Sequence, residues 1–239
     1  MSAPSRFEAV FFDLDGTLFD HGAAAAAAAA VCLPEADPAY VARRWLELEE
    51  LIYPRYLAGE LGFTEQRRMR ITMLAAEVGL GEWDTARADA WIAAYLRRYQ
   101  EHGAVFPDVH GCLDALTRLP GPPVLGIITN SNGALQRTKI AGVGLTGHFP
   151  HLVASEEAGT AKPDPEIFLL ACRTAGVDPA RTAYVGDRMA TDALGAREAG
   201  LLGIWLDRPD AAPPGPRPAD ADPPVPRITT LHELVPLLA

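Results

Sequence analysis

The chain of 239 residues is long enough for one large domain or two modest ones, each with a buried core. A composition of 49% hydrophobic and 22% charged residues excludes wholesale disorder. The 21 basic and 31 acidic side chains give a net charge of −10, so we expect neither nucleic acid nor a membrane surface as a partner.

The cysteines and the N-terminal residues indicate the cellular compartment in which we expect the protein. Cys32, Cys112 and Cys172 are widely spaced and form no CxxC pair, so we expect reduced thiols and no zinc site. Residues 1–7 lack the apolar region of a signal peptide, and the longest apolar run, residues 23–31, is too short to span a bilayer. We therefore expect a cytoplasmic protein, and whether it is a monomer or a homodimer stays open.

Short apolar runs alternate with helical patterns along much of the chain, which predicts a parallel sheet covered by helices. The predicted strands are Ala9–Asp13, Val124–Ile128, His151–Ala154, Thr182–Val185 and Leu201–Leu206. An amphipathic helix is expected over residues 109–119, a second one from Asp164-Pro165 to Gly176, and a third over residues 190–199.

Residues 20–104 interrupt this alternation. They contain helical segments at roughly 22–32, 38–58, 64–78 and 84–102 and no strand pattern. We expect these segments to form a four-helix cap domain, residues 20–104, inserted into a core domain made of residues 1–19 and 105–239.

The C-terminal part combines a proline-rich stretch with a helix signal. Residues 207–227 contain eight prolines and are predicted to form an extended surface loop. Thr230 and Glu233 then match a capping box, which predicts a short final helix.

Polar side chains follow several predicted strands. Asp13 stands at the carboxyl end of the first strand and Asp15 two residues later, Thr129-Asn130 ends the second, and Asp187 follows a later one. Asp192 comes five residues after Asp187, and Lys162 lies in the loop before the Asp164 helix. Ligands of open α/β sheets bind at the carboxyl ends of the strands, which predicts a site there. An ordinary Asp-Gly turn would explain only the first of these segments.

These residues lie within four short motifs: FFDLDGTLF, GIITN, the Lys162 segment AKPDPEIF, and VGDRMATD. In this order they resemble the four motifs of the haloacid dehalogenase superfamily, whose helical cap type is inserted between the first two. The resemblance implies an α/β fold with a doubly wound, Rossmann-like parallel sheet and a small inserted cap.

The resemblance also implies a phosphatase that acts on a small soluble phosphomonoester. Asp13 would attack phosphorus and form an aspartyl-phosphate. Asp15 would protonate the leaving alkoxide and later take a proton from water. The catalytic set is completed by Thr129 and Lys162, which would bind the phosphoryl group together with Asn130.

The negative charges expected at this site predict a bound divalent cation. A phosphate dianion next to Asp13, Asp187 and Asp192 is strongly repelled, and a hard cation with oxygen ligands, Mg²⁺, is the natural remedy. The resemblance implies that its ligands are Asp13, the backbone carbonyl of Asp15, and Asp187. Asp192 would act directly or through a water molecule.

Three other functions stay open. A phosphomutase would use the same aspartyl-phosphate and return the phosphoryl group to substrate. A 2-haloacid dehalogenase would attack carbon, but family dehalogenases lack the second acid of the first motif, so Asp15 argues against it. A catalytically silent binding module is disfavoured because every catalytic position is filled.

Other tempting features have ordinary explanations. Only two of the 21 basic residues are lysines, which favours a specific role for Lys162, whereas Lys139 is expected to be a surface charge on a helix. Arg67, Arg68 and Arg70 are expected on a solvated helix face. The GxGxxG pattern of residues 142–147 follows a helical segment and is interpreted as a helix stop. The cap sequence does not identify the substrate.

Overall fold

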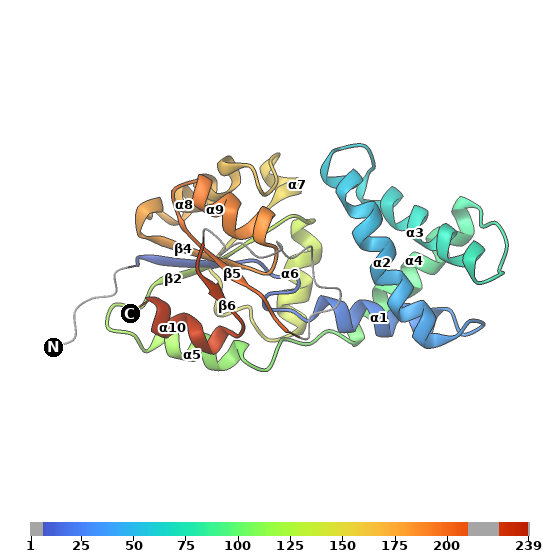
Figure 1. The fold of residues 1–239 in the computed structure, drawn as a ribbon, viewed down its shortest axis with the longest axis horizontal. Coiled ribbons are helices and arrows are strands. Elements are labelled where there is room, and N and C mark those ends of the chain that lie inside the picture. Colours follow the sequence, from blue (N-terminus) through green and yellow to red (C-terminus); the bar gives the residue numbers. More distant parts are fainter. Residues whose placement is uncertain (1–6, 210–224, 239) are drawn as a thin grey trace. The chain divides into compact units, whose positions relative to one another are not determined.

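The computed structural model describes residues 7–209 and 225–238, and the chain divides into two compact units (Figure 1). One unit comprises residues 1–20 and 104–239, and the other comprises residues 21–103. Most of the predicted proline-rich loop lies outside the described residues.

The first unit is built on a parallel sheet of six strands in the order β3-β2-β1-β4-β5-β6. The strands are β1 (Ala9–Phe12), β2 (Val124–Thr129), β3 (His151–Ala154), β4 (Thr182–Gly186), β5 (Leu202–Leu206) and β6 (Arg227–Ile228). The chain adds β2 and β3 on one side of β1 and β4, β5 and β6 on the other, which confirms the predicted doubly wound α/β fold. In such a sheet the ligand crevice lies where the strand order reverses, next to β1 and β4.

Helices cover both faces of the sheet. Figure 1 shows α8 (Pro165–Ala175) and α9 (Gly195–Glu198) on one face and α5 (Val109–Thr117) and α10 (Leu234–Leu238) on the opposite face. The remaining elements of this unit are α6 (Gly133–Gly142), α7 (Ser155–Ala158), and the short turns η1 (Pro179–Arg181), η2 (Met189–Leu194) and η3 (Leu231–Glu233).

Several predicted helix boundaries are confirmed. The side chain of Asp164 accepts a hydrogen bond from the backbone of Glu166, and Pro165 occupies the first turn of α8. Gly176, with φ of 68°, ends this helix. The Thr230 capping box precedes α10, and α6 ends at Gly142 as the helix-stop interpretation requires.

The core of this unit explains a glycine in a central strand. Gly126 of β2 pairs in register with Phe11 of β1, and a Cβ atom at Gly126 would lie 2.6 Å from Cδ1 of Phe11. The glycine therefore leaves room for the Phe11 ring. On the other side Phe11 pairs with Tyr184 of β4, whose ring meets Phe168 of α8 edge to face with centroids 5.0 Å apart.

One prediction in this unit is wrong in detail, and one strand was not predicted. The single helix expected over residues 190–199 is instead the π-helical turn η2 followed by α9. This turn packs directly on the sheet, because a Cβ atom at Gly203 of β5 would lie 1.9 Å from the carbonyl oxygen of Ala193. The two-residue strand β6 was not predicted, since it is too short to show a pattern.

The second unit contains the four predicted helices: α1 (His21–Cys32), α2 (Pro38–Leu57), α3 (Phe63–Glu77) and α4 (Thr85–Glu101). The side chains of Ala24, Ala25, Ala28 and Ala29 are buried and give α1 a smooth face, which contacts both α2 and α4. Aromatic rings fill the interior, where Trp91 stacks on Tyr95 and meets Trp45 edge to face.

The prediction of a solvated arginine face is wrong for Arg70, which is 2% exposed. Its guanidinium donates to Oε2 of Glu49 at 2.8 Å and lies 3.9 Å from the centroid of the Trp45 ring. Burial alone would raise the pKa of Glu49, but the charges of Arg70 and His21 outweigh burial and hold this pKa well below its usual range. Arg70 therefore belongs to the interior of the helical unit.

All three cysteines are free, and Cys112 and Cys172 are buried. None of the described helices has both the length and the apolarity that a membrane span requires.

Candidate active site

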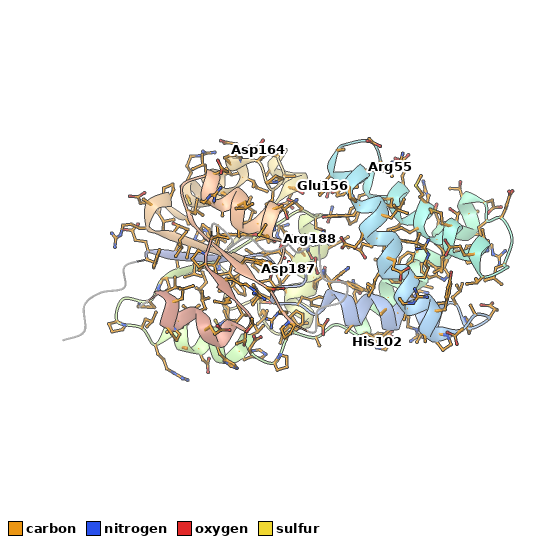
Figure 2. The ribbon with its side chains drawn as sticks, viewed as in Figure 1. Arg55, His102, Glu156, Asp164, Asp187 and Arg188 are labelled. Carbon is orange, nitrogen blue, oxygen red and sulfur yellow. The ribbon has the colours of Figure 1, made fainter. Side chains whose placement is uncertain are left out.

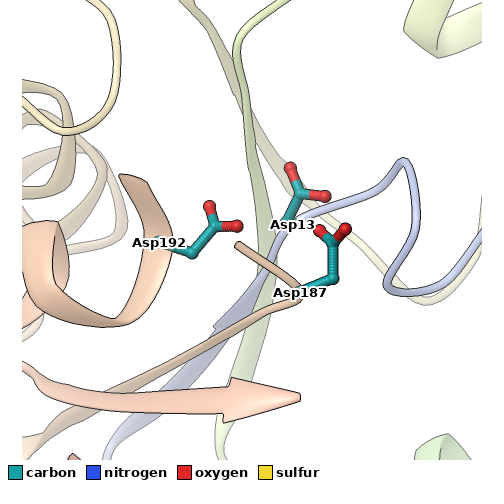
Figure 3. Close-up of side chains that lie close together, drawn as sticks. All are labelled: Asp13, Asp187 and Asp192. Carbon is teal, nitrogen blue, oxygen red and sulfur yellow. The ribbon is translucent and has the colours of Figure 1, made fainter. Parts of the chain in front are cut away.

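Side chains from several segments of the first unit meet at the carboxyl edge of the sheet. Asp13 directly follows β1, Asp187 follows β4, and Asp192 comes from η2. Figure 3 shows their three carboxylates close together, and Figure 2 shows where Asp187 and its neighbour Arg188 lie in the unit. One ligand oxygen of each carboxylate lies within 4.8 Å of the others.

Two glycines make this close approach possible. Gly16 has φ of 90°, and a Cβ atom there would lie 2.4 Å from Oδ2 of Asp187. A side chain at this position would be strained and would also collide with the carboxylate. At the end of β4, a Cβ atom at Gly186 would lie 2.4 Å from Cβ of Asp192. Both glycines therefore maintain the spacing of the carboxylates.

Burial and neighbouring negative charge raise the pKa of two of these carboxylates, Asp13 and Asp187. Burial, the dominant cause, raises the pKa of Asp13 to about 6; Lys162 lowers it and Asp192 raises it. Burial together with the charges of Asp13 and Asp192 raises the pKa of Asp187 well above its usual range. The three carboxylates outnumber the two cationic side chains that act on them, Lys162 and Arg188. An all-oxygen set of this kind suits a hard divalent cation.

Lys162 is the cation of the cluster and is 3% exposed. Its Nζ donates to Oδ1 of Asp13 at 2.6 Å, to Oδ1 of Asp192 at 2.7 Å and to the hydroxyl of Tyr184 at 2.8 Å. Burial alone would lower the pKa of Lys162, but the two carboxylates outweigh burial and raise this pKa. Lys162 is therefore a buried, charged group that joins η2 to the end of β1.

Asn130 and Tyr184 hold Lys162 in place. The side-chain nitrogen of Asn130 donates to the carbonyl oxygen of Lys162 at 2.8 Å, and its oxygen accepts from the backbone nitrogen of Lys162 at 2.7 Å. The predicted contact of Asn130 with phosphate stays a prediction. The sequence analysis did not identify Tyr184, because tyrosine is common in strands. The one available signal was its position near the carboxyl end of β4, two residues before Gly186.

Asp15 and Thr129 are joined through α6. Nε2 of Gln136 donates to Oδ2 of Asp15 at 2.8 Å and to Oγ1 of Thr129 at 2.9 Å. Nζ of Lys139 lies 2.5 Å from Oδ1 of Asp15, and the Lys139 side chain is 12% exposed. The prediction that Lys139 is merely a surface charge is therefore wrong. The scarcity of lysine was the one sequence signal that could have singled out Lys139; nothing singled out Gln136.

The structure thus brings the predicted site residues into two linked groups. Asp13, Lys162 and Asp192 are buried and form a charged cluster with the half-buried Asp187, and Asp15 pairs with α6. The two groups are covalently adjacent, since Asp13 and Asp15 leave the same strand.

A family model for haloacid dehalogenase-like hydrolases matches residues 7–200. The chain belongs to this family. Phosphoserine phosphatase of Thermus thermophilus is 42% identical over 95 residues, which cover 37% of this chain and 38% of that protein. Pyrimidine 5'-nucleotidase YjjG of Escherichia coli is 38% identical over 129 residues, covering 54% of this chain and 55% of the relative. The matched segments thus span about half or less of these curated relatives.

Solved structures of the family share the fold. The HAD-hydrolase YfnB from Bacillus subtilis, a structure bound to magnesium, matches with a TM-score of 0.80 and 23% identity, over 98% of this chain and 99% of that one. At this identity the match supports the fold alone.

Proposed function

We propose that this protein is a phosphatase that hydrolyses a small phosphomonoester through an aspartyl-phosphate on Asp13. The observation that carries the proposal is the cluster in which Lys162 holds the buried Asp13 carboxylate next to the carboxylates of Asp187 and Asp192. The names of the phosphatase and nucleotidase relatives agree with this reaction class.

In the first step an oxygen of Asp13 attacks phosphorus and the bond from phosphorus to the ester oxygen breaks. The leaving oxygen takes the bonding electron pair and a proton from Asp15. In the second step water attacks the phosphoryl group, Asp13 regains its carboxylate, and Asp15 takes the proton of the water molecule. Asp15 returns to its starting state when it has served once as acid and once as base.

Thr129, Asn130 and Lys162 would orient the phosphoryl group. Thr129 ends β2, and its hydroxyl accepts a hydrogen bond from the Gln136 amide that also donates to Asp15. The three N–H donors of Lys162 already meet three oxygens, so Lys162 would act on the phosphoryl group chiefly through its charge.

The acidic cluster fits Mg²⁺, with Asp13, the backbone carbonyl of Asp15, Asp187 and Asp192 as the proposed ligands. Their oxygen donors and excess negative charge match a hard divalent cation. When bound, the ion would neutralise charge on the phosphoryl group and on the carboxylates.

We also propose that residues 20–104 act as the family's cap domain and the rest as its core. A phosphomutase would share the first step, and its product would be an isomeric phosphate ester instead of free phosphate. The cytoplasmic location and the small-molecule substrate stay predictions.

Metal removal tests this proposal. Hydrolysis of p-nitrophenyl phosphate should fall to background in a chelator, return with Mg²⁺, and return poorly with Ca²⁺, whose looser coordination would misplace the carboxylates. Phosphate release should be measured in parallel on sugar phosphates, phosphoglycolate and nucleoside monophosphates. Full activity in the chelator, or chloride release from a 2-haloacid, would contradict the proposal.

A further inference from the structure

One face of α6 is directed at Asp15. Lys139 and Gln136 lie three residues apart on this helix and therefore on the same side of it. Lys139 pairs with Oδ1 of Asp15, and Gln136 donates to Oδ2. Each carboxylate oxygen of Asp15 therefore accepts a bond from α6, which limits rotation of the carboxylate.

Gln136 connects this carboxylate to Thr129. Its amide nitrogen carries two hydrogens, and it contacts one oxygen of Asp15 and one of Thr129. Gln136 is 1% exposed, and its Oε1 has no hydrogen-bond partner among residues 7–209 and 225–238. A buried carbonyl oxygen without a partner is unfavourable, and the two hydrogen bonds that the amide nitrogen donates offset this and fix the orientation of the amide. Because Thr129 accepts one of them, its own hydroxyl proton is available for a phosphoryl oxygen.

The Lys139 ammonium is also confined. Its Nζ lies 4.7 Å from the centroid of the Phe19 ring, on the loop that follows Asp15. The Lys139 side chain is 12% exposed and that of Asp15 is 27% exposed, so this partly buried ion pair is screened less by salt than a fully exposed pair. A solvated surface charge would not need such an environment.

We propose that Lys139 and Gln136 are positioning residues that hold Asp15 in the orientation in which it takes a proton from the attacking water. The inference rests on the proposed phosphatase function. In this step the water oxygen bonds to phosphorus, the bond from phosphorus to Asp13 breaks, and its electron pair returns to the Asp13 carboxylate. The water proton passes to Asp15. Because both oxygens of the Asp15 carboxylate accept hydrogen bonds from α6, the carboxylate is held in a fixed orientation in which it can accept the water proton.

The test separates the two halves of the reaction. p-Nitrophenol is a good leaving group and needs little protonation, so its first release reports phosphorylation of Asp13, whereas steady-state release also requires the water step. In Lys139→Met the first turnover should change less than about threefold. The steady-state rate should fall at least about tenfold, because a misplacement of about 1 Å can cost on the order of 100-fold. Rapid mixing should therefore reveal a burst of nitrophenol followed by slow turnover.

Further variants control the result. Gln136→Leu should raise the ratio of burst to steady-state rate and also weaken inhibition by inorganic phosphate, because the Thr129 hydroxyl loses its orientation. Lys139→Arg retains a cation and should turn over faster than Lys139→Met. Arg137→Met removes an exposed charge from α6 that pairs with Glu157, and it should behave like the wild type.

Failure of the inference and failure of the proposed function give different results. If the wild type turns over and Lys139→Met slows both phases equally, or neither phase, Lys139 does not position Asp15 for the water step. If the wild type releases no nitrophenol with Mg²⁺ present, the proposed function is overturned and this inference with it.

Discussion

Lys162 illustrates how one side chain organises the site. Its ammonium meets Asp13 and Asp192 at 2.6 and 2.7 Å while it is almost fully buried, and these partners are 149 and 30 positions away in sequence. Removing one partner of a buried ion pair costs about 3–5 kcal/mol, so the three groups depend on one another.

Lys162→Arg should therefore damage the enzyme although the charge is retained. A planar guanidinium is bulkier and prefers bidentate partners, so it would displace the Asp13 carboxylate. We expect kcat on p-nitrophenyl phosphate to fall at least about tenfold, with the far-UV circular dichroism spectrum unchanged. A kcat within about twofold of wild type would show that Lys162 does not position Asp13.

Residues of the site differed in how far the sequence revealed them. Asp13, Thr129 and Asp187 were predicted because each stands where an apolar strand pattern ends. Gln136 was not predicted, because its partner Asp15 is 121 positions away. The two residues meet only because α6 packs with this face toward Asp15. Arg70 was assigned to the surface because it is charged, and the sequence does not show that Arg70 pairs with Glu49 inside the helical unit.

The turn η2 positions Asp192, and its packing on the sheet requires strand residues without side chains beneath it. Gly203 of β5 and Gly186 of β4 leave no room for a Cβ atom under η2. At Gly203 the neighbouring atoms belong to the backbone of Ala193, so this contact cannot relax by rotating a side chain.

Gly203→Ala should therefore shift η2 and with it Asp192. Overpacking of this kind costs about 1–3 kcal/mol, and the shift should also lower kcat by at least about tenfold. Chemical denaturation and steady-state kinetics measure the two effects. Gly142→Ala is the matched control, since a Cβ atom there would contact nothing within 4 Å, and it should change neither. Equal behaviour of the two variants would show that η2 tolerates displacement.

Elements with a strong period were predicted well. The four helices of the second unit and the strands β1 to β5 were expected within about two residues of their ends, because burial and proline, aspartate or glycine signals mark them. The π-helical turn was predicted as an ordinary helix, since its form results from contact with β4 and β5, and no local signal in the sequence reports that contact.

The topology of the sheet brings the site residues together. The strand order reverses at β1 and β4, so residues that end these strands meet although they are far apart in sequence. The order of the four motifs made this arrangement predictable from the sequence. The links between side chains of α6, β2 and the Asp15 loop were not, because they require the tertiary packing of α6.

The proposed reaction depends on phosphorylation of Asp13. The Asp15→Asn variant should be mixed with p-nitrophenyl phosphate and Mg²⁺, quenched in acid, digested and analysed by mass spectrometry. Because this variant lacks the base for the water step, we predict that one phosphoryl group accumulates on Asp13. The same treatment of an Asp13→Asn, Asp15→Asn double variant should leave the peptide unmodified. Phosphorylation at another residue, or an unmodified Asp13 peptide during nitrophenol release, would show that Asp13 is not the nucleophile.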